Sequence, residues 1–100
     1  MILTALAERP QHGYGIVADV ERLSDGRVRL RAGTLYTALD RLSTDELVEV
    51  EREEVVEGRL RRYYRLTPKG REALRAEVDR LESNLSAARA RLAFDQGGAT

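Results

Sequence analysis

Arginines that could bind phosphate groups gather in two segments of the chain. Between Arg27 and Arg41 there are four arginines and one acidic residue, and from Gly58 to Arg75 there are seven basic residues and one acidic residue. The guanidinium group presents N–H donors in a planar fork, which suits phosphate oxygens and the acceptor edges of bases. From Asp45 to Glu57, by contrast, seven acidic residues accompany one basic residue. The net charge of zero therefore combines basic and acidic segments, although two solvated faces of opposite sign would give the same pattern.

Few residues of the chain could support catalysis or metal binding. There is no cysteine and a single histidine, His12, so disulfides, thiolate metal sites and a cysteine nucleophile are excluded. No serine has a histidine in a plausible triad context, and there is no glycine-rich phosphate loop. The glutamates between Glu49 and Glu57 could suggest a cation site, but a charged strand edge that discourages aggregation explains them better. We expect no enzyme, no cofactor and no metal.

Two helices are predicted at the start of the chain. Residues 2–7 are apolar except for one threonine, and Pro10 should stop the helix that they form. Residues 14–23 carry apolar side chains at spacings of three and four from Ile16, which indicates a second helix. Turn-forming residues at 24–26 end this helix.

Some side chains are assigned to the core or to the surface mainly from their residue type. We expect Tyr14 and Tyr64 in the core, and Asp19 on the polar side of the second helix. Residues 27–30 alternate charged and apolar side chains, which predicts a very short strand.

A third helix is predicted to follow Gly33 and Thr34. Leu35, Leu39 and Leu42 repeat at spacings of four and three and should face the core, with Ala38 beside them. The exposed side then carries side chains that donate hydrogen bonds, namely Thr34, Tyr36, Thr37 and Arg41.

The period then changes to that of a hairpin. Val48, Val50 and Arg52 alternate with Glu49, Glu51 and Glu53, which predicts a strand with two distinct faces. Glu57 and Gly58 suit the turn, and residues 60–66 form the return strand. On this strand Leu60, Tyr64 and Leu66 share one face, whereas Arg59, Arg61, Tyr63 and Arg65 share the other.

The last helix begins at Thr67 and Pro68, a threonine cap followed by a proline that the first helical position tolerates. Its apolar residues are spaced alternately by four and three, which is the seam of a coiled coil. We expect the first turns to pack on the head and the remainder to pair with an identical subunit; the alternative is that the whole helix folds back. The seam consists of Leu74, Val78, Leu81, Leu85, Ala88 and Leu92.

Three helices, a hairpin and a further helix make a mostly α fold with a β-hairpin wing, the winged helix-turn-helix. We expect a DNA-binding head at residues 1–67, a dimerisation helix at residues 68–96 and a frayed tail at residues 97–100. The exposed donors of the third helix would contact the major groove, and the wing would contact the DNA backbone through Arg59, Arg61 and Arg62. The alternative is an ordinary polar surface on a small α+β domain.

Four stretches of the chain resemble the PadR family of bacterial transcriptional regulators. These are residues 10–14, the predicted recognition helix at 33–42, the return strand with its flanks at 58–67, and Gly70. The length resembles that of the short subgroup with a single C-terminal helix. Three features depart from the family pattern. Thr37 replaces a usual proline, and Glu46 replaces a usual glycine in the helix-to-strand turn. The chain also begins almost inside the first helix, which leaves open a longer natural N-terminus.

This resemblance implies a homodimeric repressor that binds double-stranded DNA at a pseudo-palindromic operator and is released by a small, often aromatic, effector. It also implies a hydrogen-bonding role for His12 at a helix junction. The chain has no signal peptide and no long apolar segment, so we expect a cytoplasmic protein without membrane contact. Two alternatives remain: a winged-helix module that binds protein without specific DNA binding, and a small-molecule sensor with weak DNA binding.

Overall fold

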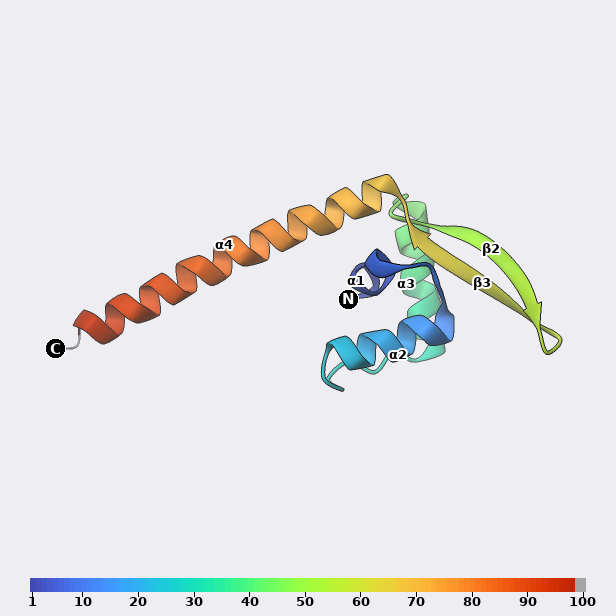
Figure 1. Ribbon diagram of the computed structural model, residues 1–100, viewed down its shortest axis with the longest axis horizontal. Helices are drawn as coiled ribbons and strands as arrows, with labels where there is room; N and C mark the ends of the chain where they lie inside the picture. The colour runs from blue at the N-terminus through green and yellow to red at the C-terminus, as the bar shows by residue number, and fades with distance from the viewer. Residues whose placement is uncertain (99–100) are drawn as a thin grey trace.

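The computed structural model describes the backbone of residues 1–98 and the side chains of residues 1–94. A compact head is followed by a long projecting helix, and the hairpin extends from the head in the opposite direction (Figure 1). The molecule measures 68 × 28 × 21 Å along its principal axes. The elements in chain order are α1 (Ile2–Glu8), β1 (Gln11–His12), α2 (Gly13–Leu23), α3 (Ala32–Thr44), β2 (Val48–Val56), β3 (Arg59–Leu66) and α4 (Pro68–Gly98). The predicted winged helix-turn-helix fold with a C-terminal helix is confirmed.

The hydrophobic core lies between the three helices of the head and the base of the hairpin. Each helix contributes two buried side chains, and the hairpin contributes three, so every element of the head is anchored by the same cluster. Burial of each large aliphatic side chain stabilises the fold by about 1.5–3 kcal/mol. The predicted core positions of Leu35, Leu39 and Tyr64 are confirmed, whereas Ala38 and Leu42 are only half-buried. The buried hydrophobic residues that form this core are Ala5, Leu6, Ile16, Val20, Leu35, Leu39, Val48, Tyr64 and Leu66.

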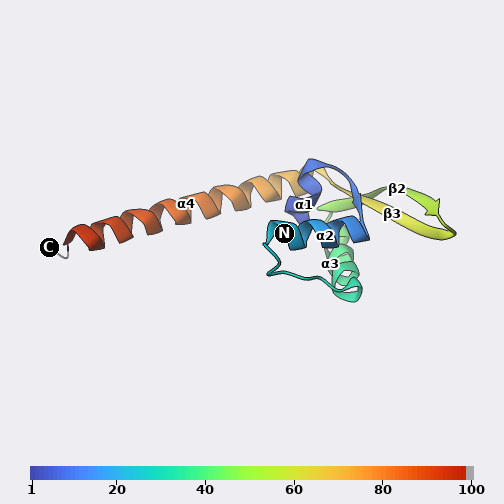
Figure 2. The ribbon, with the colours of Figure 1, turned by 60° about the horizontal axis from the view of Figure 1, so that its bottom comes forward.

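The sheet has a third strand at a place that the sequence pattern did not indicate. Its order is β1-β3-β2, and the two residues of β1 pair antiparallel with β3, Gln11 with Tyr64 and His12 with Tyr63. The strand predicted at residues 27–30 is wrong, because this segment forms the irregular connection between α2 and α3 (Figure 2). The Val28 amide there donates to the Ser24 hydroxyl at 2.9 Å. Alternation alone does not make a strand without a partner, and the second edge of β3 is paired with β1 instead.

A bulge interrupts the predicted alternation of β2. Val50 is paired with Tyr64, but Arg52 is paired with Tyr63, so Glu51 is an extra residue opposite the junction of two partners. The expected placement of Arg52 on the same face as Val50 is therefore wrong. Its guanidinium carbon instead lies 3.9 Å from the centroid of the Tyr63 ring, an attractive cation–π contact on the other face.

The turn between α3 and β2 holds Glu46 in the left-handed conformation, with φ of 61°. The Leu47 amide donates to the Leu42 carbonyl at 2.9 Å, and the Glu46 amide donates to the Ser43 carbonyl at 3.0 Å. This pair of hydrogen bonds defines a Schellman motif, whose left-handed position usually holds glycine. Glu46 thus adopts the left-handed backbone conformation that glycine favours, although it carries a side chain.

Helix α4 is joined closely to the end of this turn. Thr67 caps the helix by accepting the Gly70 amide at 2.9 Å, and its own amide donates to the Leu47 carbonyl at 3.1 Å. A Cβ atom on Gly70 would lie 1.9 Å from that same carbonyl oxygen, so only glycine permits this approach.

Beyond Leu74, which packs against the core, the described side chains of α4 are exposed. The helix continues to Gly98, two residues past its predicted end at residue 96, and residues 99–100 of the expected tail lie outside the described part. No helix within residues 1–98 is long and apolar enough to cross a membrane.

Candidate nucleic-acid interface

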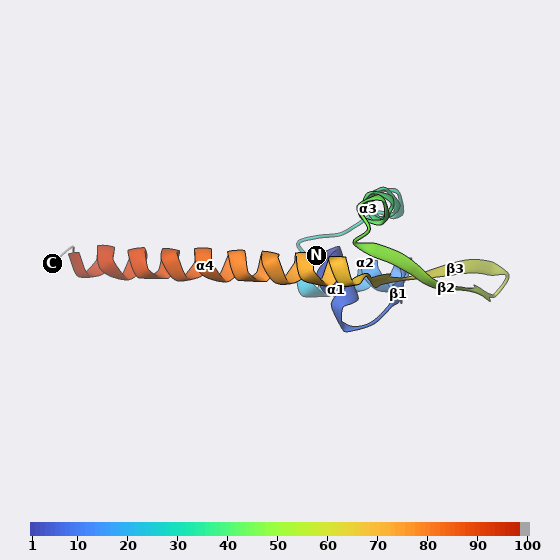
Figure 3. The ribbon, with the colours of Figure 1, turned by 90° about the horizontal axis from the view of Figure 1, so that it is seen from above.

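Helix α3 stands away from the rest of the head on one side, as Figure 3 shows in a view nearly along its axis. Leu35 and Leu39 are fully buried and fix the helix to the core. The side opposite these leucines is open, and no atom lies within 4 Å of the place where a Cβ atom on Gly33 would be. The predicted contact residues of this helix are all exposed: Thr34, Tyr36, Thr37 and Arg41.

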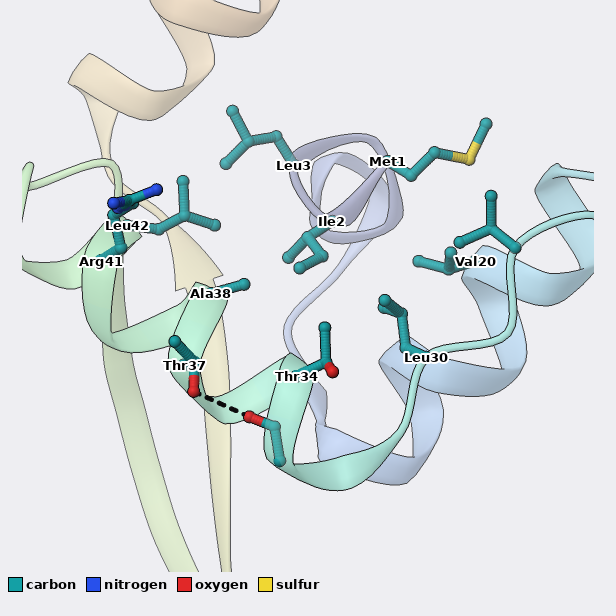
Figure 4. A pocket seen from close by; sticks show the side chains of 12 residues that line it. Met1, Ile2, Leu3, Val20, Leu30, Thr34, Thr37, Ala38, Arg41 and Leu42 are labelled. Carbon is teal, nitrogen blue, oxygen red and sulfur yellow. Dashed lines mark hydrogen bonds between the residues drawn. The ribbon is translucent and has the colours of Figure 1, made fainter.

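These four residues lie on two flanks of α3. Thr34, Thr37 and Arg41 line a groove of about 1120 Å³, which we call the α1–α3 groove, whose other wall includes Ile2 and Leu30 (Figure 4). The Thr37 hydroxyl donates to the Gly33 carbonyl at 2.9 Å, so its oxygen remains able to accept a hydrogen bond from a ligand.

Tyr36 faces the opposite flank, toward the hairpin. There a cavity of about 460 Å³, which we call the wing cleft, separates the start of α2 and Tyr36 from the tip of the hairpin. All three predicted wing arginines, Arg59, Arg61 and Arg62, line its far wall together with Glu57 of the hairpin turn. The structure thus brings the recognition-helix flank and the wing arginines to one cleft.

The three predicted wing arginines differ in their surroundings. Successive residues of β3 point to opposite faces, so Arg59 and Arg61 share one face and Arg62 lies on the other. The Arg62 guanidinium is paired with Glu53 at 3.2 Å, whereas neither Arg59 nor Arg61 has a carboxylate within salt-bridge distance in the described part of the chain. Exposed ion pairs contribute only about 0.2–1 kcal/mol, so Glu53 is a weak competitor for a phosphate group.

Two further arginines belong to this basic surface. Arg27 lies in the connection between α2 and α3, and Arg31 is the residue that precedes the first turn of α3. Both are exposed, and neither forms an ion pair among the described residues, whereas Arg29 between them is paired with Glu21 at 3.3 Å. The sequence count showed this concentration of arginine but did not single out these two residues.

His12 connects the wing to the start of α2. Its Nδ1 atom accepts the Gly15 amide at 3.3 Å and so caps α2, while its ring makes an edge contact with Tyr63 at 5.3 Å between centroids. Burial, reinforced by the positive charge of Arg61, lowers the pKa of His12 below its usual 6.5. A neutral imidazole is required for this cap, because a protonated Nδ1 cannot accept a hydrogen bond. The hydrogen-bonding role that the resemblance implied is the one observed.

A family model for the transcriptional regulator PadR-like family matches residues 2–76. The chain belongs to this PadR-like family. It is 41% identical over 81 residues to "Transcriptional regulator Rv3488" of Mycobacterium tuberculosis, which covers 81% of this chain and 72% of that protein. It is 46% identical over 78 residues to an uncharacterized 37.1 kDa protein in transposon TN4556 of Streptomyces fradiae, covering 78% of this chain but only 21% of that protein's length.

Solved structures of related regulators share the fold. A transcriptional regulator from Clostridium thermocellum superposes with a TM-score of 0.74 at 26% identity, covering 88% of this chain and 85% of that one. Bacillus subtilis PadR, solved in complex with operator DNA, superposes with a TM-score of 0.68 at 19% identity, covering 77% of this chain and 44% of that one. The second likeness concerns the fold alone. The PadR-like assignment agrees with the expectation of a regulator rather than an enzyme.

A buried polar network supports the wing side of this PadR-like head, and the sequence pattern missed it. The Gln11 side chain donates to the Ala5 carbonyl at 2.8 Å and to the Asp19 carboxylate at 2.9 Å, and Arg22 donates to the same carboxylate. Asp19 is therefore buried rather than on the polar side. The hydrogen bond from Gln11 is the main reason that the pKa of Asp19 lies below its usual value. This network ties α1, β1 and α2 together.

The α4 seam is exposed along the projecting part of the helix. The large side chains of the seam beyond Leu74 have exposed fractions between 43% and 64%, namely Val78, Leu81, Leu85 and Leu92. Exposed aliphatic residues in one line on a helix indicate a surface that a partner covers. Among residues 1–98 there is no group of three or more potential metal ligands.

Proposed function

We propose that this PadR-like chain is a sequence-specific DNA-binding regulator. The observation that carries the proposal is the wing cleft, where the exposed flank of α3 and two arginines without carboxylate partners face the same space. Phosphate contacts dominate the affinity of such proteins for DNA. The same fold occurs in Bacillus subtilis PadR, a protein that was solved in complex with operator DNA.

In the proposed complex, α3 lies in the major groove and the wing lies along the adjacent backbone. Thr34, Tyr36, Thr37 and Arg41 contact base edges and flanking phosphates from α3, and Arg59, Arg61 and Arg62 contact the backbone from the wing. Arg62 must exchange its partner Glu53 for a phosphate to do so.

The proposed regulator is a homodimer. Residues 1–67 form the DNA-binding head, and residues 68–96 form the dimerisation helix, in which the exposed α4 seam packs against a second copy. A head of this size has a modest core, so association adds apolar burial that the monomer lacks. Twofold symmetry would place two α3 helices on the half-sites of a pseudo-palindromic operator in cytoplasmic DNA.

The proposal extends to repression that a small aromatic effector relieves. The α1–α3 groove supports this part, because apolar side chains line it beside Thr34, Thr37 and Arg41. A ligand bound there would touch the same residues that contact DNA. The expected result is that an effector found by screening weakens DNA binding, and that a variant with Ala38→Trp, which fills the groove, no longer responds to it.

One observation favours a second candidate function. The net charge is zero, and β2 presents several glutamates next to the wing arginines, which is unusual for a DNA-binding surface. A winged-helix module that binds a protein partner would have no need of a basic face. In that case α4 would bind a different protein, and sedimentation would show a monomer at micromolar concentration.

A salt titration tests the main proposal. Binding is measured by fluorescence anisotropy to the DNA immediately upstream of the gene, with an unrelated duplex as control. The double variant Arg59→Ala/Arg61→Ala should bind all duplexes more weakly, and the slope of log affinity against log salt should fall by about 1.8, from the loss of two phosphate contacts. The matched control is Arg9→Ala/Arg80→Ala, which removes the same charge at sites outside the wing cleft.

The outcomes separate the parts of this proposal. An unchanged affinity in the Arg59/Arg61 variant contradicts the wing assignment. Binding to the upstream fragment no tighter than to the control would show that the operator does not lie beside the protein's own gene. The operator is then sought by genome-wide site selection.

A further inference from the structure

The wing cleft lies where a DNA backbone must pass, if the proposed function holds. A helix in the major groove and a wing at the neighbouring minor groove are separated by one sugar–phosphate strand. That strand has to run between α3 and the hairpin, and the wing cleft is the space between them. This inference rests on the proposed function and names the residues that hold the strand.

Tyr14 lines the wing cleft and was expected in the core, but that expectation is wrong. Its side chain is 73% exposed, the most exposed of the large hydrophobic residues in the head, since it lies on the outer side of the first turn of α2. In the described part of the chain its hydroxyl forms no hydrogen bond, unlike that of Tyr63, which donates to Glu54 at 3.3 Å. An exposed phenol at this place leaves a donor free for a phosphate oxygen.

Tyr36 brings a second phenol to the same wall. A Cβ atom on Gly13 would lie only 2.7 Å from the Tyr36 hydroxyl oxygen, so the absence of a side chain at Gly13 lets Tyr36 rest against the start of α2. Half of the Tyr36 side chain remains exposed, with an exposed fraction of 48%. Two hydroxyl groups from two helices therefore border one side of the wing cleft.

The opposite wall of the wing cleft is positively charged, and it belongs to a hairpin whose base is held by the head. Arg59, Arg61 and Arg62 line this wall, and Glu57 in the turn is the acidic residue that lines it with them. Arg62 is paired with Glu53, so the unpaired charge comes from Arg59 and Arg61. The wing is held to α2 by the pairing of β1 with β3 and by the contact of the His12 ring with Tyr63. The pairing and the ring contact therefore hold the base of the hairpin against α2, and the part that carries Arg59 and Arg61 projects beyond them.

We propose that Tyr14 contacts DNA directly, by donating its hydroxyl hydrogen to a phosphate of the strand that passes through the wing cleft. Tyr36 supports that strand from the same wall, and Arg59 and Arg61 neutralise it from the other. Glu57 opposes binding, because its carboxylate faces the same phosphates.

The test compares single-atom changes in the full-length protein. Tyr14→Phe removes only the hydroxyl and should weaken binding to duplex DNA at least about tenfold, the expected loss of a hydrogen bond to a charged group. Tyr63→Phe is the matched control, because the Tyr63 hydroxyl is bonded to Glu54 and Tyr63 does not line the cleft. The affinity of this variant for duplex DNA should stay within about twofold of that of the wild type. Glu57→Gln should strengthen binding several-fold.

A neutral backbone analogue locates the contact. Duplexes carrying one methylphosphonate at successive positions should reveal a phosphate whose neutralisation weakens the wild type but no longer weakens Tyr14→Phe. Equal affinities for wild type and Tyr14→Phe would overturn the inference while leaving the proposed function intact. A wild-type protein that binds no duplex at low salt would overturn both, and weakening of Tyr63→Phe equal to that of Tyr14→Phe would assign the effect to the fold instead.

Discussion

Replacement of Glu46 by glycine should stabilise the protein, even though it removes a charged side chain. Glu46 is held at φ of 61° by the Schellman hydrogen bonds at the end of α3, and its carbonyl accepts the Thr67 hydroxyl. The left-handed conformation costs a residue with a Cβ atom about 1–2 kcal/mol. Glycine avoids this cost but gains flexibility in the unfolded chain, which offsets about 0.4–1 kcal/mol. The net expectation is a gain of about 0.5–1 kcal/mol.

The assay is urea unfolding at fixed protein concentration, because association with a second copy would make the apparent stability depend on concentration. A gain of this size corresponds to a rise in melting temperature of about 2–8 °C for a chain of this length. Glu46→Ala is the matched control, since alanine also removes the carboxylate but keeps the Cβ atom and should show no gain. If glycine and alanine gave the same stability, the strain at this turn would not be the cause.

Two further predictions concern His12 and α4. The folded-state pKa of His12 is lowered, so the unfolded chain binds a proton at this side chain before the folded chain does as the pH falls. The contribution of His12 to the free energy of unfolding should therefore be complete above about pH 6.5, the usual pKa of histidine. It should decrease as the pH falls toward the folded-state pKa. His12→Asn keeps a capping side chain without titrating, and urea unfolding across this range should show a smaller loss than wild type; an identical loss would assign the pH dependence elsewhere. Leu85→Lys should convert the proposed dimer to a monomer in sedimentation, whereas Ser83→Lys, outside the seam, should not. A dimer that persisted in Leu85→Lys would show that the α4 seam is not the interface.

Local periodicity was sufficient to predict the helices and the hairpin. Leu35 and Leu39 in α3, and the seam of α4, repeat at helical spacing, and the Glu57–Gly58 turn adopts positive φ at both residues, as a two-residue hairpin turn requires. Such features depend on neighbours within one element, so the chain order contains them. The arginines of the wing could be found in the same way, since they lie in the strand that this periodicity predicts.

The errors arose where the environment of a residue is set by another element. The two residues of β1 carry no pattern of their own and become a strand only because β3 has a free edge. The bulge at Glu51 likewise depends on the partner strand.

The positions of Tyr14 and Asp19, by contrast, could have been deduced from helical geometry. Tyr14 precedes the buried Ile16 by two residues, about 200° around the helix, whereas Asp19 follows it by three and shares its face. Residue type outweighed position in the expectation, which placed the aromatic residue inside and the acid outside. Gln11, which satisfies the Asp19 carboxylate, could be identified only from the structure.

The close junction at Gly70 gives α4 the properties of a lever. Its first turn is pressed against the Leu47 carbonyl at the end of the α3 turn, so the direction of α4 is tied to the direction of α3. The 31 residues of the helix span about 46 Å, and a tilt of about 5° at the junction displaces the far end by about 4 Å. In the proposed dimer the long arms are joined, so the same tilt would instead move the two heads. The distance between half-sites that the proposed dimer accepts would then depend on this junction, where Gly70 meets the Leu47 carbonyl, at a place remote from the residues proposed to contact DNA.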